Sequence, residues 1–403
     1  MPIQNSVKRM KNHSFHLFDG PERKSFLPFT YIRPVAHIFI GMSNLQEKWE
    51  DALGENCGVF TQDYLNTKFP RTISDENTFI NPAFIPNDYL ASQILSLKPN
   101  QALVQSENLI AYKTSAQFPQ MSLSGLDCVE VKEELIHLTN VTDLFRFNAQ
   151  LIELDFIRLT RDKKSAEISN TNQLISPENI FIEEGANVEF ATLNATHGPI
   201  YIAKNAIVME GSLIRGGFYL GENAQVKMGA KIYGGTSVGP FSKVGGELNN
   251  VLFFGYSNKA HDGFLGNAVI GEWCNIGAAT DASNLKNTFS KLRVWNYSTE
   301  NFAKTDLQFC GLLMGDFSRC SIHTTFNTAT TVGISANLFG VGFPRTFIPS
   351  FSYGGAQGLT TFDFDKAIEA SKMMMDRRGK SLSKIDIEIL QVTFEETSKW
   401  RKK

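Results

Sequence analysis

The sequence has 403 residues, of which 42% are hydrophobic and 20% charged, and its 39 Lys and Arg against 41 Asp and Glu give a net charge of −2. This length exceeds one ordinary core, and the hydrophobic content excludes a disordered tail. No apolar run reaches the roughly 18 residues of a membrane helix, and the balanced charge provides no overall basic field for nucleic acid or an anionic membrane.

Residues 1–16 are polar and basic and lack the apolar stretch of a signal peptide, so we expect a flexible N-terminus there. The cysteines are odd in number and scattered, with no C-x-x-C pair: Cys57, Cys128, Cys274, Cys310 and Cys320. This pattern predicts reduced thiols and a cytoplasmic protein, and it favours neither a disulfide framework nor a zinc site.

Residues 17–140 mix apolar runs with helix-like stretches at 44–53 and 87–97. Such alternation predicts an α/β domain with a largely parallel sheet. Residues 142–159 have apolar spacing near 3.6 and predict a helix within a linker at 141–172.

An aliphatic residue falls at every sixth position over a long central stretch: Ile202, Val208, Ile214, Leu220, Val226, Ile232, Val238 and Val244. A small residue follows four positions later in most repeats, as at Ala206, Ser212 and Ala230. This period predicts a hexapeptide parallel β-helix over residues 173–361, in which each hexad forms one face of a triangular prism. The alternative, a β-sandwich, fits less well because the alternation of period two is largely absent.

The sixfold spacing fails at residues 250–263 and again at 282–307, before it returns between Met314 and Leu338. Insertions in a solenoid usually lie on one face, which is often the binding face, so we expect the chemistry in these two loops. Residues 362–403 predict two amphipathic helices, 364–377 and 384–400, separated by Gly379.

The string LFDGPERKSFLPFTYIRPV, residues 17–35, resembles the phosphate-binding loop of sugar nucleotidyltransferases. Followed by a hexapeptide prism, it makes the chain similar to the alternative bifunctional GlmU-like family, which joins a UDP-N-acetylglucosamine diphosphorylase to a glucosamine-1-phosphate N-acetyltransferase. The resemblance implies a small Rossmann-like nucleotidyltransferase domain, a left-handed β-helix and a homotrimer. It also implies acetyl-CoA and UTP as cosubstrates, Mg²⁺, and sugar phosphates and nucleotides as the ligands, with neither nucleic acid nor membrane insertion.

The resemblance is most specific over residues 244–288, where the segments ELNN, NKAHDGFLGN and NIGAAT correspond to the acetyltransferase motifs of the family. It implies that His261 is the general base and Glu247 its partner. The implied substrate contacts are Asn249, Asn250, Asn258, Lys259 and Asn275, and the implied acetyl-CoA turn is Gly277, Ala278 and Ala279. Lys231, in a coil upstream of Glu247, is a candidate for the positive charge that Asn249 does not supply, and an ordinary solvated lysine is the alternative. The chain departs from the family pattern where Asn249 replaces a lysine, Phe264 a tyrosine and Ala279 a glycine.

The chemistry of acyl transfer favours the same residues. An amine that attacks a thioester must lose a proton, and imidazole accepts protons near neutral pH. His261 is the only histidine in the first break of the repeat. Backbone N–H groups at the Gly277–Ala278 corner are candidates for stabilising the thioester oxygen. His197 and His323 lie closer to regular repeats and are interpreted as structural.

Nucleotidyl transfer needs cations over a triphosphate and a Mg²⁺ held by oxygen ligands. We expect Gly20 to form the phosphate turn, with Arg23 and Arg33 on the phosphates and Lys24 behind them. Val35 stands where the family has lysine, and Asn81 where it has a metal-binding aspartate. Asp19, Asp63 and Asp88 remain alternatives, so the metal ligands are unknown.

Two other functions stay open at this point. The solenoid is compatible with acyl transfer to a different amino sugar beside an inactive nucleotide domain. It is also compatible with a non-catalytic trimeric scaffold.

Overall fold

The computed structural model describes residues 8–9, 13–120 and 122–401. Most of the predicted flexible N-terminus, residues 1–16, therefore lies outside the described residues. Its last four residues are an exception, because strand β2 (His13–Phe18) begins there. Phe15 and Leu17 of this strand are buried in a hydrophobic core, which explains why the segment is ordered.

The chain forms two compact units. Unit 1 ends at Val141, and unit 2 begins at Thr142 and continues through the remaining chain. Two short earlier segments, Leu27–Phe29 and Phe39–Met42, also belong to unit 2.

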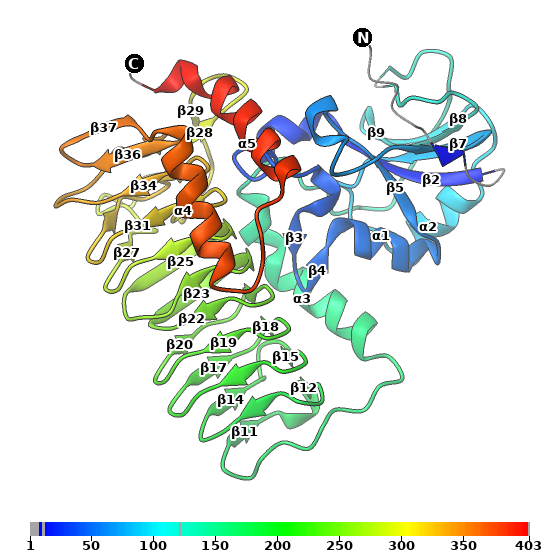
Figure 1. Cartoon of the computed structure of the whole chain (residues 1–403). Coiled ribbons are helices and arrows are strands. Elements are labelled where there is room, and N and C mark those ends of the chain that lie inside the picture. The colour runs from blue at the N-terminus through cyan, green and yellow to red at the C-terminus, as the bar shows by residue number, and fades with distance from the viewer. Residues whose placement is uncertain (1–7, 10–12, 121, 402–403) are drawn as a thin grey trace. The chain divides into compact units, whose positions relative to one another are not determined.

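Unit 1 is an α/β domain built on a six-stranded sheet (Figure 1). In spatial order its strands are β10 (Asp127–Glu130), β8 (Gln101–Gln105), β9 (Asn108–Thr114), β7 (Glu76–Ile80), β2 and β5 (Cys57–Phe60). Strand β9 runs antiparallel to both neighbours, whereas the other pairs are parallel. The sheet is thus mixed, with its parallel part around β2.

Two helices accompany this sheet, α1 (Leu45–Leu53) and α2 (Asp88–Leu95). Both lie in the stretches that the sequence predicted as helical. Asn44 and Glu47 form a reciprocal capping box that starts α1, and Gly54 ends it in a left-handed conformation. Such caps satisfy the backbone groups that the first and last turns leave unpaired. Four short strands also occur before Val141: β1 (Lys8–Arg9), β6 (Thr72–Ile73), β4 (Ser43–Asn44) and β3 (Phe39–Ile40). Of these, β3 lies in a segment of unit 2.

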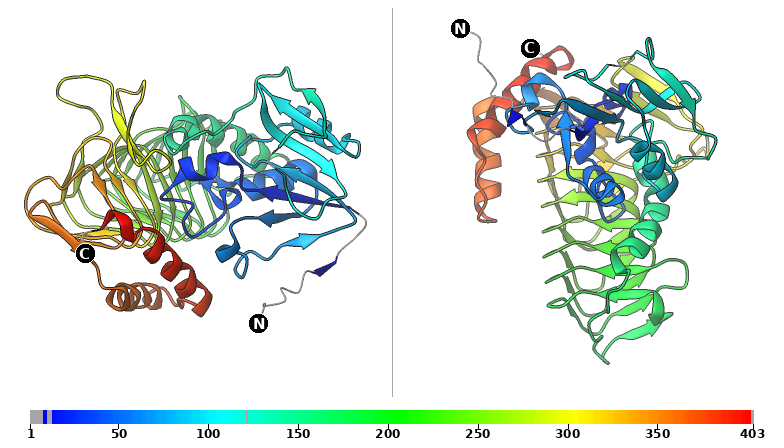
Figure 2. Two further views of the ribbon diagram at one scale, coloured as in Figure 1. Left: turned by 90° about the horizontal axis from the view of Figure 1, so that it is seen from above. Right: turned by 90° about the vertical axis from the view of Figure 1, so that its right-hand side faces the viewer.

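Unit 2 is a parallel β-solenoid followed by helices, as predicted (Figures 1 and 2). Its first face consists of β12 (Ile180–Ile182), β15 (Ile200–Ile202), β18 (Phe218–Leu220), β21 (Thr236–Val238), β30 (Leu313–Met314), β33 (Thr331–Val332) and β35 (Phe347–Ile348). Its second face consists of β13 (Asn187–Val188), β16 (Ile207–Val208), β19 (Gln225–Val226), β22 (Lys243–Val244), β24 (Asn258–Lys259), β26 (Asn275–Ile276), β31 (Arg319–Cys320), β34 (Asn337–Leu338) and β36 (Ser352–Gly355). Its third face consists of β11 (Gln173–Ile175), β14 (Thr192–Asn194), β17 (Leu213–Arg215), β20 (Lys231–Ile232), β27 (Asp281–Ala282) and β32 (Thr325–Phe326).

The predicted sixfold positions all point into the solenoid. Every aliphatic residue of the central series is buried, and the register stacks them in columns such as Val208, Val226 and Val244. Strands β23 (Glu247–Gly255) and β25 (Phe264–Glu272) are longer and each contribute to both the third and the first face.

The second break of the repeat forms a hairpin of β28 (Arg293–Asn296) and β29 (Asn301–Lys304). Trp295 in this hairpin stacks on Phe347 with ring centroids 3.8 Å apart, and Tyr297 packs edge-on against Trp400. These aromatic residues thus pack on the end of the solenoid and the C-terminal segment, whereas Lys291 and Asp306 of the same loop line a cavity, so the expectation that this loop carries chemistry stays a prediction.

Three helices accompany the solenoid: α3 (Asp143–Thr160), α4 (Phe364–Asp376) and α5 (Lys384–Glu396). All three occur where the sequence predicted them. The short β37 (Gly358–Thr361) precedes α4 and pairs antiparallel with β36. Among the residues that the structure describes, none of the helices has the length and apolar composition that crossing a membrane requires.

Candidate functional site

A cavity of about 780 Å³ lies in unit 2, beside the second face of the solenoid and the end of α4. Figure 1 shows α4 running alongside the stacked coils. The lining residues are Lys243, Tyr256, Asn258, Ala260, His261, Trp273, Asn275, Ile276, Gly277, Ala278, Arg319, Ile322, Ala370, Met373, Met374, Arg377 and Arg378.

The cavity is strongly cationic. Lys243, Arg319, Arg377 and Arg378 line it, and none of the described lining residues is Asp or Glu. Burial lowers the pKa of Lys243, and the nearby charge of Arg378 lowers it further. Burial followed by repulsion from Arg377 likewise lowers the pKa of Arg378. Cations that lower one another's pKa favour an anionic ligand.

One wall of the cavity is aromatic. Phe241, Tyr256 and Trp273 occupy the same corner of successive coils, and each has a left-handed backbone conformation. Their rings stack, with centroids 4.9 Å apart for Phe241 and Tyr256 and 4.3 Å for Tyr256 and Trp273. Tyr256 and Trp273 line the cavity, and because Tyr256 is stacked between Phe241 and Trp273, both faces of its ring are already covered.

The sequence reasoning missed this wall, although the sequence contains a signal for it. The segments FSKV, YSNK, WCNI and FSRC each place an aromatic residue three positions before an inward residue. That recurrence marks one corner of the solenoid.

His261 lies in the turn between β24 and β25, and its side chain is exposed at the cavity. The predicted residues Asn258, Asn275, Gly277 and Ala278 line the same cavity. Asn258 accepts a hydrogen bond from Arg378 at 2.8 Å and donates one to Asn275 at 3.3 Å. The structure thus brings together five residues that the sequence assigned to acyl transfer.

Other predicted residues lie elsewhere. Glu247 begins β23 on the third face, is not among the cavity's lining residues, and has no recorded hydrogen bond to His261 within the described chain. Lys231 and Asn249 are exposed on the same face. Asn250 lines a different cavity of about 460 Å³, together with Asn267. The predicted pairing of Glu247 with His261 is therefore not formed within one chain.

Two further predictions need correction. Lys259 is fully buried, and its amine donates to the backbone carbonyls of His261 and Asp262, so it does not line the cavity as a substrate contact. The amides of Gly277 and Ala279 already donate to the carbonyls of Cys320 and Asp262. These two N–H groups are therefore not available to the oxygen of a thioester. Ala279 itself is a left-handed corner residue outside the lining set.

In unit 1 the predicted phosphate loop follows β2, and its charged side chains bond to other residues of the same unit. Arg23 donates to the carbonyl of Thr30 at 2.7 Å and to the Tyr64 hydroxyl at 2.9 Å, and it forms an ion pair with Asp19 at 3.0 Å. Asp19 also accepts from the amide of Val35 at 2.8 Å. Arg23 thus stabilises its own loop.

The other predicted phosphate ligands differ in exposure. Arg33 and Gly20 are buried, whereas Lys24 is exposed. A side chain at Gly20 would come within 2.3 Å of the Glu22 carboxylate, so glycine is required by packing. Lys24 is therefore open to solvent, whereas Arg33 is not.

The acidic residues of this loop have partners within the protein. Burial raises the pKa of Asp19, partly offset by the charge of Arg23. Glu22 accepts from the Asn81 amide at 3.1 Å and lies 2.7 Å from His137 Nε2. Asp63 pairs with Arg71, and Asp88 begins α2.

No group of three His, Cys, Asp or Glu side chains suited to a metal occurs among the described residues. Mg²⁺ at a nucleotide is commonly held by one or two carboxylates together with phosphate oxygens, and in this loop Asp19 and Glu22 already accept hydrogen bonds from the protein.

Comparison with known proteins gives one family match. Residues 15–164 match a family described as sugar nucleotidyl transferase. The chain thus combines a nucleotidyltransferase-like α/β domain with a parallel β-solenoid.

Among solved structures, the chain is similar to the Arabidopsis UDP-N-acetylglucosamine acyltransferase, with 12% sequence identity over 54% of this chain and 78% of that one and a TM-score of 0.28. A similarity this low supports no conclusion about activity. No curated protein matches the chain.

Proposed function

We propose that unit 2 transfers an acetyl group from acetyl-CoA to the amine of an amino-sugar phosphate, with glucosamine 1-phosphate as the first candidate. The observation that carries this proposal is the position of His261 at a cavity lined by four cations and a stacked aromatic wall. Phosphates suit the cations, and the aromatic wall adds apolar contact area beside them.

In the proposed reaction the amine nitrogen attacks the carbonyl carbon of the thioester, and His261 accepts the proton that the nitrogen loses. The carbon–sulfur bond then breaks, the thiolate leaves, and the proton passes from His261 to the sulfur. General-base assistance of this kind contributes about 10²–10⁴ in rate. Asn258 and Asn275 beside His261 are placed to hydrogen-bond sugar hydroxyls.

The test is mass spectrometry of the products after incubation with acetyl-CoA and glucosamine 1-phosphate. We expect the N-acetylated product, and we expect His261→Ala to lower its rate about 10²–10⁴-fold. His197→Ala is the matched control, because His197 is also exposed on unit 2 but does not line the cavity. A His261→Ala protein with the full rate would overturn the assignment of the base.

We further propose that unit 1 takes part in uridylyl transfer from UTP to N-acetylglucosamine 1-phosphate. The match of residues 15–164 to sugar nucleotidyl transferases supports this second activity. The test is pyrophosphate release from UTP, measured with and without added Mg²⁺. Tight UTP binding without pyrophosphate release would instead favour an inactive nucleotide domain beside an acyltransferase for another amino sugar.

The non-catalytic alternative has its own test. If acetyl-CoA binds the folded protein, its presence at 100 times Kd stabilises the fold by about 2.7 kcal/mol. Failure of millimolar acetyl-CoA to raise the melting temperature would favour a scaffold.

We also propose a homotrimer. Leu213, Met228 and Tyr233 are large apolar side chains exposed on successive coils of the solenoid, and an assembly would bury them. Sedimentation equilibrium tests this, and a monomer would contradict it.

A further inference from the structure

Lys259 occupies a position that is otherwise apolar. The strand register stacks it in one inward column of the second face, above Val244 and in line with Ile276 and Cys320. The side chain is 0% exposed and is among the largest fully buried ones in the chain.

The amine of Lys259 lies beneath the turn that carries His261. It donates to the backbone carbonyl of His261 and, at 2.8 Å, to that of Asp262. The Asp262 carbonyl also accepts the amide of Ala279 in the next coil. The lysine therefore joins two successive peptide groups of the turn to the interior of the solenoid.

The turn is adapted to this lysine. In other coils the residue four positions after the inward one is small and buried, as with Ser212, Ala230, Thr280 and Thr324. After Lys259 the corresponding residue is Gly263, where a side chain would meet the Thr280 carbonyl at 2.2 Å. At this corner the Lys259 amine takes the place that a small buried side chain occupies in other coils.

Stabilisation of the folded protein does not explain why residue 259 is a lysine. Burial lowers the pKa of Lys259 to about 8, although the carboxylates of Asp281 and Asp262 oppose the shift. Burial also raises the pKa of the neighbouring Cys320 thiol, so that thiol is neutral near pH 8. An apolar side chain would fill the column without this desolvation cost.

We propose that Lys259 is a positioning residue that holds the His261 turn from inside the solenoid, so that the imidazole stays in place at the cavity. The role of His261 in this statement rests on the proposed acyl transfer. Small displacements of a reacting group lower rates steeply, by about 10²-fold for 1 Å, so a rigid turn has a direct effect on catalysis.

The strength of the hydrogen bonds from the Lys259 amine to the His261 turn depends on pH. Between pH 6 and 8 the amine is charged and its two hydrogen bonds are charge-assisted, which makes them roughly twice as strong as neutral ones. Above about pH 8 the amine loses its proton and the turn loosens. We therefore expect an alkaline decline in turnover with a midpoint near pH 8.

The first experiment does not depend on activity. It compares amide hydrogen exchange of the peptide spanning residues 260–264 in the wild type, Lys259→Met and Val244→Met at pH 7. Val244→Met is the matched control because it places the same side chain in the same column of the preceding coil, at a buried residue that does not line the cavity. We expect exchange about 10-fold faster in Lys259→Met only, with a melting temperature that is unchanged or higher.

The second experiment measures acetyl transfer by the same proteins from pH 6 to 9.5. In Lys259→Met we expect kcat to fall about 10-fold or more, KM for acetyl-CoA to stay within about 2-fold, and the alkaline decline to disappear. Val244→Met should keep the wild-type pH profile.

The outcomes separate the two hypotheses. If the wild type transfers no acyl group while Lys259→Met loosens the turn, the proposed function fails and the structural role of Lys259 stands. If exchange and the pH profile of Lys259→Met match the wild type, the positioning role is overturned. A lower melting temperature with no change in either readout would also overturn it, since it would show a role in packing alone.

Discussion

Arg378 connects the helical region after the solenoid to the cavity. Its guanidinium donates to the Asn258 side chain at 2.8 Å and to the carbonyl of Phe241. Both of these acceptors are neutral, and the positive charge of Arg378 lowers the pKa of Lys243 in addition to the effect of burial. A phosphate group would relieve this repulsion, so we expect an anionic ligand to gain much of its binding energy at Lys243 and Arg378.

Replacing Arg378 by glutamine should therefore weaken binding of coenzyme A. We expect Kd to rise about 10-fold at low salt, because a charge-assisted hydrogen bond contributes about 1.5–3 kcal/mol. The difference should narrow at about 0.5 M salt, where screening is strong. Isothermal titration calorimetry measures both values.

Lys380→Gln is the control, since Lys380 is exposed in the same connection and does not line the cavity. Equal losses for the two variants would indicate a general charge effect and contradict a specific role for Arg378.

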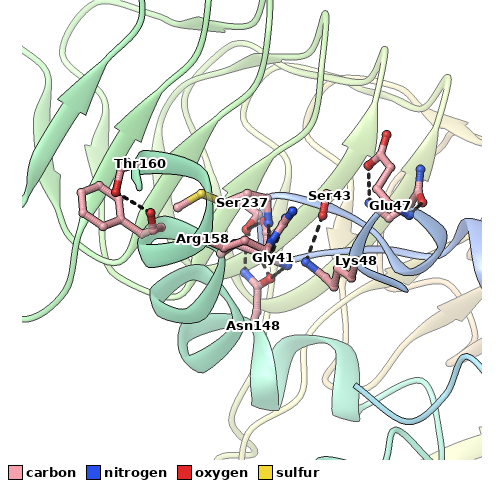
Figure 3. A network of polar contacts seen from close by, with 12 residues as sticks. Gly41, Ser43, Glu47, Lys48, Asn148, Arg158, Thr160 and Ser237 are labelled. Atoms are coloured by element: carbon pink, nitrogen blue, oxygen red, sulfur yellow. Dashed lines mark hydrogen bonds and ion pairs between the residues drawn. The ribbon is translucent and has the colours of Figure 1, made fainter. Parts of the chain in front are cut away.

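At the scale of elements, α3 is held to the rest of unit 2 by a buried amide (Figure 3). The Asn148 side chain accepts from the amide of Gly41 at 2.8 Å. It donates to the carbonyl of Gly235 at 2.8 Å and to the Ser237 hydroxyl at 3.0 Å. Asn148 thus satisfies backbone groups of two other segments from one position on the helix.

Asn148→Ala should lower the free energy of unfolding of unit 2 by about 2–3 kcal/mol, because it leaves a buried N–H and a buried carbonyl without a partner. Urea unfolding followed by hydrogen exchange of α3 measures the loss. Gln150→Ala, an exposed change on the same helix, should stay within about 0.5 kcal/mol. A similar small effect for Asn148→Ala would show that the network contributes little.

The solenoid also shows where the sixfold spacing in the sequence stops predicting which residues point inward. The sixfold spacing predicted the inward residues up to Val244 because every coil there has the same length. The coil from Val244 to Lys259 is three residues shorter than the coil from Val226 to Val244, so the spacing failed although the fold continued. The resemblance implied that Lys259 is a substrate contact, and because Lys259 lies outside the visible repeat, the spacing gave no sign that it points inward.

The cavity was predicted only in part, for a related reason. His261, Asn258 and Asn275 lie on adjacent coils and could be identified from the segments around them. Arg377 and Arg378 come from the end of α4, and no spacing in the sequence connects that helix to the second face. In unit 1 the resemblance identified the loop at residues 17–35, but the sequence could not show that Arg23 and Glu22 use their charges within the protein.

At the scale of the whole molecule, each of the two units has its own hydrophobic core, and the units differ in the titratable groups that those cores contain. Unit 1 contains His16, which is fully buried, hydrogen-bonds Asn77 at 2.9 Å and contacts the rings of Phe60 and Phe79. Burial lowers the pKa of His16 to about 4, and burial also lowers that of His37, in the same unit, to about 4.

Unit 1 should therefore lose stability in mild acid. The unfolded chain binds a proton at each histidine below about pH 6.5, whereas the folded unit does not bind it until about pH 4. Stability is complete above pH 6.5 and falls as the pH drops toward 4, with up to about 3 kcal/mol lost for each histidine. Hydrogen exchange of β2 and β7 at pH 7 and pH 5, corrected for the intrinsic exchange rate, measures this decline.

His16→Gln keeps an amide that can bond Asn77 but does not titrate, so it should remove about half of the pH dependence. His197→Gln changes an exposed residue of unit 2 and should leave exchange in β2 unchanged. If His16→Gln keeps the entire dependence, the acid sensitivity of unit 1 arises from other groups, and the buried imidazole of β2 is not its source.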